Sequence, residues 1–136
     1  MPSMKIFDIA GSAMAAQSVR LNTVASNLAN AGNVTGDPQA VYKPVEPVFS
    51  SKVLNAAQPG LAGVRVERIE QSQAEPLKRY EPGNPLADPQ GYVYAPDIDP
   101  VAQMVNMISA ARAYQADVEM LNTGKELALA TLNLGR

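Results

Sequence analysis

The sequence contains no cysteine and no histidine among its 136 residues. Without cysteine the chain has no disulfide framework, no thiolate metal site and no thiol nucleophile. Without histidine it also lacks the commonest catalytic base and the commonest metal ligand. These absences argue against an enzyme, and we expect no cofactor, no metal ion and no small-molecule substrate.

Long apolar runs are missing as well. No window of about eighteen apolar residues occurs, so we expect no direct membrane insertion. Asp8 and Ser12 interrupt the apolar residues of the N-terminal stretch, which argues against a cleaved secretory signal. The net charge of −2 gives no electrostatic reason to expect binding to nucleic acid or to an anionic membrane.

Proline divides the sequence into three parts. Ten of the eleven prolines lie between Pro38 and Pro100, which excludes long helices from this region. We therefore predict an N-terminal helix in residues 1–32, a Pro/Gly-rich middle segment in residues 33–99 and a C-terminal helix in residues 100–136. The length allows at most one ordinary domain.

Capping residues mark the expected ends of the helices. Ser3 or Asp8 suits the N-cap of the first helix, and Gly32 suits a left-handed C-cap. Asp99 precedes Pro100 at the start of the second helix, which is the usual order of an N-cap and a first-turn proline. Asp97 and Asp99 together also suggest a cation site. The stretch "DIDP" lacks the glycine and the distal glutamate of a calcium loop, however, so we favour helix capping.

The middle segment contains short stretches typical of strands. Residues 63–71 alternate apolar and charged side chains, and residues 91–96 are rich in β-forming types. Between them, residues 81–91 concentrate proline, glycine and asparagine, which indicates a hairpin tip or a connection. Glu67 and Glu70 do not form a catalytic carboxylate pair, since a spacing of three puts them on opposite faces of a strand.

Both predicted helices carry an apolar heptad pattern over about four heptads, which favours a coiled coil. In the C-terminal helix the a and d positions are Met104, Met107, Ala111, Tyr114, Val118, Leu121, Lys125, Ala128 and Leu132. In the N-terminal helix they are Phe7, Ala10, Met14, Gln17, Leu21, Val24, Leu28 and Ala31. We predict a mainly α fold with a small β part, in which the helices pair antiparallel as a coiled coil. An ordinary small helical hairpin is the alternative.

The N-terminal helix is nearly free of charge. Between Ile9 and Gly36 the only ionisable side chain is Arg20. A helix with small and amide side chains all round is expected to be covered on more than one face, because nothing on it suits water. One partner helix cannot cover every face, so we expect other subunits to do so. The amides of Asn27 and Asn30 are candidates for hydrogen bonds across subunit contacts.

Arg20 is expected to have a specific acceptor, because a buried unpaired charge is strongly disfavoured. Its own helix offers no carboxylate within reach. The acceptor must then come from the C-terminal helix, the middle segment or a neighbouring subunit, and Asp117 and Glu119 on the C-terminal helix are the intrachain candidates. The alternative is an exposed arginine that faces water or a channel.

Two end motifs resemble those of the axial proteins of the bacterial flagellum. "DIAGSAMAAQSVRLNTVASNLANAGN" is similar to the N-terminal rod-and-hook signature, carried here by Gln17, Arg20, Leu21, Ser26, Asn27, Leu28, Ala29 and Asn30. "MVNMISAARAYQADVEMLNTGKELALATLNLGR" is similar to the C-terminal signature, carried by Met107, Ile108, Ala110, Arg112 and Tyr114. The short middle segment, including "YEPGNPLADPQGYVYAPDID", is similar to that of the proximal rod members.

The resemblance implies a structural subunit of the proximal rod, whose terminal helices build a tubular drive shaft that transmits torque and encloses the export channel. It implies export through the type III gate without a cleaved signal and a place in the basal-body rod within the periplasmic space. The implied partners are other rod proteins, copies of the chain and the export-gate adaptor at the rod base. The alternative is a coiled-coil adaptor or a secreted translocator-type protein of a type III system. The expected assembly residues are Met14, Gln17, Arg20, Leu21, Val24, Ser26, Asn27, Leu28, Asn30, Met104, Met107, Ile108, Ala111, Tyr114, Val118, Leu121 and Leu132.

Overall fold

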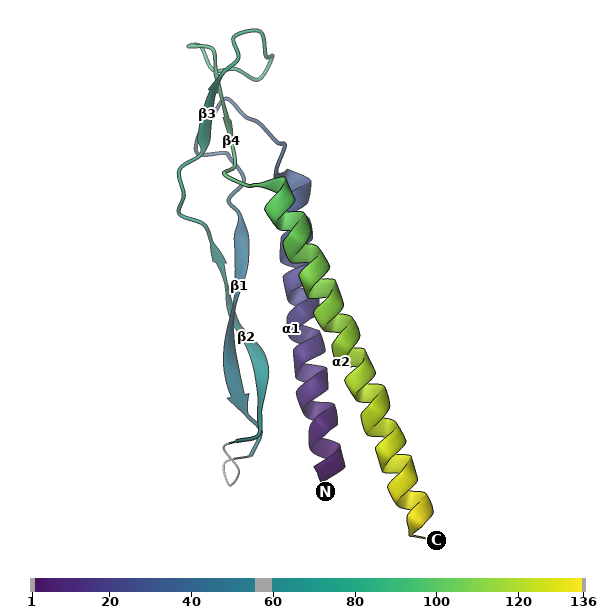
Figure 1. Cartoon of the computed structure of the whole chain (residues 1–136). Helices are drawn as coiled ribbons and strands as arrows, with labels where there is room; N and C mark the ends of the chain where they lie inside the picture. The colour runs from purple at the N-terminus through teal and green to yellow at the C-terminus, as the bar shows by residue number, and fades with distance from the viewer. Residues whose placement is uncertain (1, 56–59, 136) are drawn as a thin grey trace.

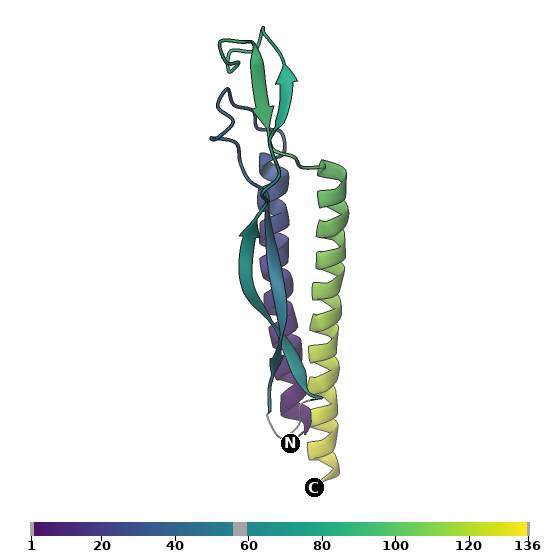
Figure 2. The same cartoon turned by 90° about the vertical axis from the view of Figure 1, so that its left-hand side faces the viewer.

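Two long helices run antiparallel beside each other and form most of the molecule (Figure 1). Helix α1 spans Pro2–Asn30, and helix α2 spans Pro100–Leu134. The end of α2 extends past the start of α1 in both views (Figures 1 and 2). The structure, a computed structural model, describes residues 2–55 and 60–135. The predicted fold class is confirmed in its coarse form, a mainly helical protein with a small β part.

The start of α2 is capped as predicted. The Asp99 carboxylate accepts a hydrogen bond from the backbone N–H of Val101 at 2.9 Å, and Pro100 is the first helical residue. The carboxylate satisfies a backbone donor that has no partner within the helix, and proline has no N–H to lose there. Capping therefore accounts for this acidic residue.

The predicted caps of α1 are wrong. Ser3 and Asp8 both lie inside the helix, so neither is an N-cap. Gly32 does not adopt the left-handed conformation, since Gly91 is the only glycine with positive φ among the described residues. The helix stops earlier, at Asn30, whose side-chain amide donates to a backbone carbonyl of the last turn at 2.8 Å. Such side-chain bonds offer the backbone an alternative to helix continuation.

A long β-ribbon lies along α1 (Figure 2). Strand β1 (Val45–Val53) pairs antiparallel with β2 (Ala62–Gln71), with a β-bulge after Val48. The predicted strand at residues 63–71 is confirmed as β2. Strand β1 was not predicted, because Pro47 interrupts its pattern; an edge strand tolerates this proline, whose missing N–H is not needed on the unpaired side.

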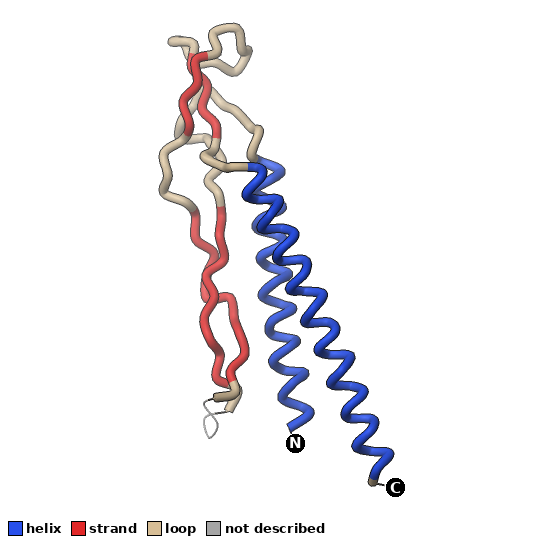
Figure 3. Tube along the Cα trace, in the orientation of Figure 1, coloured by secondary structure: helices blue, strands red, loops and turns tan. Residues whose placement is uncertain are grey.

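A second hairpin continues the ribbon beyond the ends of the helices (Figure 3). Strand β3 (Leu77–Tyr80) pairs with β4 (Tyr92–Ala95), and residues 81–91 form the hairpin tip, as one of the two sequence readings predicted. The other edge of β4 exchanges two backbone hydrogen bonds with Thr35, at 2.8 and 2.9 Å. The segment that leaves α1 therefore anchors the second hairpin to the helices.

The buried core is small and is made mostly of small side chains. Its apolar members are Ala10, Ala16, Val24, Val41, Val93, Ala95, Ile98 and Ala110. The accessible surface is 9117 Å². A compact monomer of 14.4 kDa is expected to expose about 6,800 Å². The elongated chain therefore leaves about a third more surface open than a compact protein of its size, and contact with other molecules can bury this excess.

Candidate assembly interface

Helix α2 exposes large apolar side chains over much of its length. Near its start they form a first patch, Val101, Met104, Val105 and Ile108. Near its end they form two smaller patches on opposite sides of the helix, Leu127 with Leu134 and Leu129 with Leu132. Ile108 is 57% exposed and Leu132 is 70% exposed. Contiguous exposed apolar surface on a soluble protein usually marks a contact with another molecule.

The face of α2 that lies on α1 is built around small residues. Ala110 and Gly124 are the buried residues of α2. A Cβ atom on Gly124 would lie 2.9 Å from Cγ2 of Ile6, so the absence of a side chain lets the two helices approach closely. Partly covered residues continue this face at heptad spacing: Gln103, Met107, Tyr114, Asp117, Leu121 and Ala128.

Among the predicted a positions of α2, Met104, Lys125 and Leu132 are wrong because they are exposed, whereas Ala111 and Val118 are partly covered. The d positions are covered as predicted. The most buried residues of α2, Ala110 and Gly124, lie one residue before the expected a positions Ala111 and Lys125. Pattern reading assigned the larger apolar side chains to the seam between the helices. Close packing instead selects small residues there and leaves Met104 and Leu132 outside, available to other chains.

Arg20 is held by an amide of α2. Its Nε donates to Asn106 Oδ1 at 2.7 Å, and its Nη2 donates to the same oxygen. The expectation of an acceptor on α2 is confirmed, but the expected carboxylates, Asp117 and Glu119, are wrong. Asp117 lies about 16 Å further along α2, at 1.5 Å per residue. Within the described residues Arg20 forms no ion pair.

Two further amides lie one helical turn from this contact. Gln17 precedes Arg20 on α1, and Gln103 precedes Asn106 on α2. The side-chain oxygens of both glutamines are buried and have no hydrogen-bond partner in the described part of the chain. The neighbours of the guanidinium along both helices are therefore uncharged, and its positive charge is not compensated.

Asp117 is the opposite case on α2. It is partly covered, and it makes no hydrogen bond or ion pair with any residue that the structure describes. Burial raises the pKa of its carboxyl above the ordinary value, with no neighbouring positive charge to lower it. Among the described residues Asp117 therefore has no positively charged partner, and Arg20 has no negatively charged partner.

Asn27 joins α1 to the ribbon and is 1% exposed. Its Nδ2 donates to the Val45 carbonyl oxygen at 2.9 Å, and its Oδ1 accepts from the Val45 N–H at 2.9 Å and from the Tyr42 hydroxyl at 3.0 Å. The amide thus binds the strand backbone as another strand would. The expected bonds of Asn27 across a subunit contact are wrong, because its own chain uses all of these groups.

Ser12 makes a second connection to the ribbon, nearer the start of α1. Its Oγ donates to the Ile9 carbonyl oxygen at 2.8 Å and accepts from the Val64 N–H at 3.1 Å. A Cβ on the preceding Gly63 would lie 2.5 Å from this oxygen, so the contact requires glycine in β2. Asn27 and Ser12 together fix the ribbon on α1 at two points.

The other expected residues of α1 are partly or fully covered by the chain itself. Ser26 Oγ lies 3.0 Å from the Tyr42 hydroxyl, and the Asn30 amide bonds to Ser26 and Asn33. Hydrogen bonds of Asn30 across subunits are thus not needed to satisfy its amide. The apolar residues of α1 that were expected in the interface, Met14, Leu21, Val24 and Leu28, are all partly or fully covered.

The exposed part of α1 is a narrow stripe: Asp8, Gly11, Ala15, Ser18, Asn22, Ala25 and Ala29. The expectation that this helix is covered on more than one face is confirmed. The expected source of the second cover, other subunits, is corrected, because the ribbon of the same chain lies on α1 beside α2. Sequence reasoning missed Ser12, Gly63, Tyr42, Asn106 and Gly124. The glycine at a heptad position of an otherwise regular helix was the one signal that could have identified Gly124.

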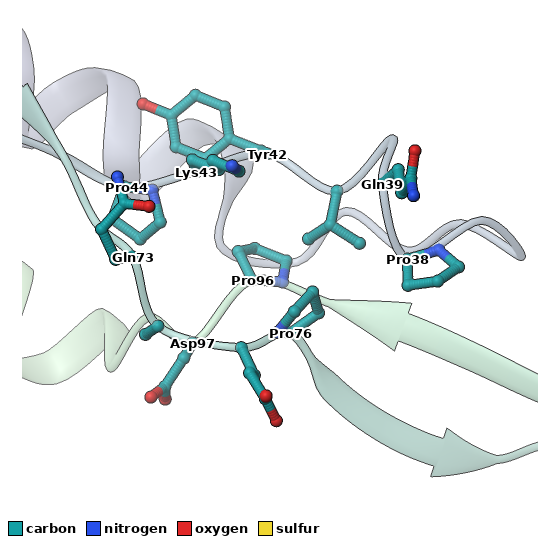
Figure 4. A pocket seen from close by; sticks show the side chains of 12 residues that line it. Pro38, Gln39, Tyr42, Lys43, Pro44, Gln73, Pro76, Pro96 and Asp97 are labelled. Atoms are coloured by element: carbon teal, nitrogen blue, oxygen red, sulfur yellow. The ribbon is translucent and has the colours of Figure 1, made fainter.

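A groove of about 500 Å³ lies between the segments that connect α1 to β1, β2 to β3 and β4 to α2 (Figure 4). Four of its twelve lining residues are prolines, Pro38, Pro44, Pro76 and Pro96, and Tyr42 lies beside them. The described residues hold no group of His, Asp or Glu side chains arranged to bind a metal ion. None of the described helices is long and apolar enough to cross a membrane.

Two protein-family models match the ends of the chain. Residues 7–36 match the model described as "Flagella basal body rod protein". Residues 90–134 match the model described as "Flagellar basal body rod FlgEFG protein C-terminal". The matches cover most of α1 and all of α2, the helices that carry the candidate interface. The fold and these matches define a structural rod protein of the bacterial flagellar basal body.

Comparison with curated relatives identifies one family within this class of rod proteins. The flagellar basal-body rod protein FlgC of Escherichia coli O6:H1 is 54% identical over the full length of both chains. FlgC of Salmonella typhimurium is 53% identical over the full length of both, and FlgC of Aquifex aeolicus is 42% identical over 88% of this chain and 87% of its own. The chain belongs to the FlgC family of flagellar basal-body rod proteins. It is a structural subunit of the rod and not an enzyme, as predicted.

Proposed function

We propose that the chain assembles through coiled-coil packing of α1 and α2 into the tubular wall of the proximal rod. This tube encloses the export channel and transmits motor torque. The observation that carries the proposal is the apolar surface of α2, which the chain itself leaves uncovered at Val101, Val105 and Ile108. Torque requires dense contacts that do not slide, and interlocking helical faces with small residues provide them.

The proposal extends to partners and location. Neighbouring rod proteins, further copies of the chain and the export-gate adaptor at the rod base contact the exposed faces of the helices. The chain reaches the periplasmic part of the rod through the type III gate without losing a signal peptide. On α1 the proposed interface consists of Arg20, from the predicted residues, and of the exposed stripe, which was not predicted; Asn27 is used internally.

A single substitution in the first patch tests the proposal. We expect Ile108→Asp to be exported and folded but to stop rod growth, because a carboxylate would be buried without a partner. Gln115→Asp is the matched control, an exposed polar position on the same helix. Swimming in soft agar and the amount of chain in purified basal bodies are measured in a strain without its own copy. Normal swimming with Ile108→Asp would refute this use of the α2 surface.

A further inference from the structure

Two uncompensated charges lie on the seam between α1 and α2. Arg20 is partly covered and contacts only the amide oxygen of Asn106 through its guanidinium. Asp117 is partly covered and has no partner among the described residues, whereas the other charged residues of α2 are exposed. Partial burial makes each charge costly unless an opposite charge approaches it.

Asp117 lies on the same side of α2 as Asn106, the residue that binds Arg20. Arg20 marks the level of Asn106, and Asp117 follows Asn106 by eleven residues, which is close to three full turns of an α-helix. The two levels are therefore about 16 Å apart along the axis. Within one chain this separation is too long for an ion pair, since an arginine side chain extends only about 7 Å.

We propose that Arg20 of one copy binds Asp117 of a second copy, which lies parallel to the first and is displaced by about 16 Å along the helix axis. The proposal rests on the proposed packing of copies through their terminal helices, and it names the contact that sets their stagger. Arg20 does not need to release Asn106. A guanidinium has five N–H donors, and only Nε and Nη2 bind the amide.

The two charges indicate that the molecule that binds at this site is a second copy of the same chain. Arg20 of one copy meets Asp117 of the next copy, and Asp117 of the first copy stays available to Arg20 of a third copy on its other side. The contact uses different surfaces of the two copies, so it does not close on itself, and its repetition builds an open helical assembly. The exposed apolar patches of α2 supply additional area for the same contact.

Charge exchange between copies tests the proposal. R20E and D117K are each expected to lose rod assembly, because each variant brings like charges together in contacts between identical copies. Co-expression of both variants in one cell should restore assembly. In alternating copies the carboxylate introduced by R20E then meets the ammonium introduced by D117K, and the native Arg20 meets the native Asp117. The double variant R20E/D117K should also swim. Full swimming of either single variant, or failure of the mixture, would overturn the proposal.

Rescue by the double variant without rescue by the mixture would place the coupling within one chain and would also overturn it. The matched control is K5E mixed with D117K. Rescue by this pair would assign Asp117 to Lys5 instead of Arg20. Loss of assembly with Ile108→Asp, combined with no effect of the charge variants, would leave the rod function standing and remove only this contact.

Cysteine cross-linking gives a second test that does not depend on charge reversal. The chain has no cysteine of its own, so introduced thiols are the only reactive ones. Basal bodies that contain R20C and D117C copies together should give disulfide-linked dimers on oxidation. The chain with both substitutions should give a ladder of multimers, because each copy then links to two neighbours. Absence of dimers from functional mixed basal bodies would refute the contact.

Discussion

The two helices differ in how their sequences relate to their surroundings. Helix α1 carries little charge, and α2 and the ribbon cover all of it except a narrow stripe. Helix α2 carries more charge and a similar share of large apolar residues, yet only Ala110 and Gly124 are buried. Apolar content alone would therefore not tell which helix is covered by the rest of the chain.

The difference shows two separate tasks. Helix α1 holds the chain together, because its small side chains allow close approach and its amide and hydroxyl groups bind the backbone of the ribbon. Helix α2 presents surface, because many of its large apolar residues are exposed on its outer sides. Substitutions in α1 should therefore act first on the isolated chain, and substitutions on the outer face of α2 should act on assembly.

The largest effect on the isolated chain is expected at Asn27. Asn27→Leu leaves the Val45 N–H and C=O and the Tyr42 hydroxyl without their buried partner. We expect the free energy of unfolding to fall by about 2–5 kcal/mol. Urea titration followed by circular dichroism measures the change. Asn22→Leu, at an exposed position of the same helix, is the control and should stay within about 0.5 kcal/mol of the parent. Equal losses in both variants would contradict the internal role of Asn27.

A smaller effect is expected where β2 touches α1. Gly63→Ala should cost about 1–3 kcal/mol, because the new methyl group would overlap the Ser12 hydroxyl. The cost should shrink when Ser12→Ala removes this oxygen. A double-mutant cycle on the unfolding free energy measures the coupling between the two positions. Additive losses would mean that the close contact does not hold the ribbon.

A substitution in the first patch of α2 is expected to have a still smaller effect on the free energy of unfolding of the isolated chain. Ile108→Asp should change the free energy of unfolding by no more than about 0.5 kcal/mol, since the side chain is already exposed. The same urea titration, carried out on chain shown to be monomeric by sedimentation, provides the value. A loss of stability as large as that of Asn27→Leu would show that Ile108 contributes to the stability of the isolated chain although its side chain is exposed.

The smallest effect is expected at Asp117, and it depends on pH. Its raised pKa means that the folded chain binds the proton more tightly than the unfolded chain, so charging the carboxyl destabilises the fold. Asp117→Asn should therefore raise the melting temperature at neutral pH. The gain should disappear as the pH falls below the ordinary value of 3.8, where both states are protonated. A gain that persists unchanged at low pH would exclude this explanation.

The sequence predicted the large elements well because their signals are local. Asp99 before Pro100 fixed the start of α2, and alternation over residues 63–71 fixed β2. The positions of the side chains in the site depended on long-range packing, which no local pattern carries. Heptad reading could not distinguish the seam with Gly124 from the neighbouring line with Leu132, and nothing near Asn27 in the sequence indicated that Val45 would be its partner.

Thiol labelling of Ile108→Cys tests most directly whether assembly covers the outer face of α2. This substitution replaces isoleucine by a smaller, weakly polar side chain and gives the chain its only thiol. In the purified monomer it should react with a maleimide as fast as Gln115→Cys. In purified basal bodies from swimming cells Ile108→Cys should be protected at least tenfold relative to the monomer. Equal labelling rates in the monomer and in basal bodies would contradict the account.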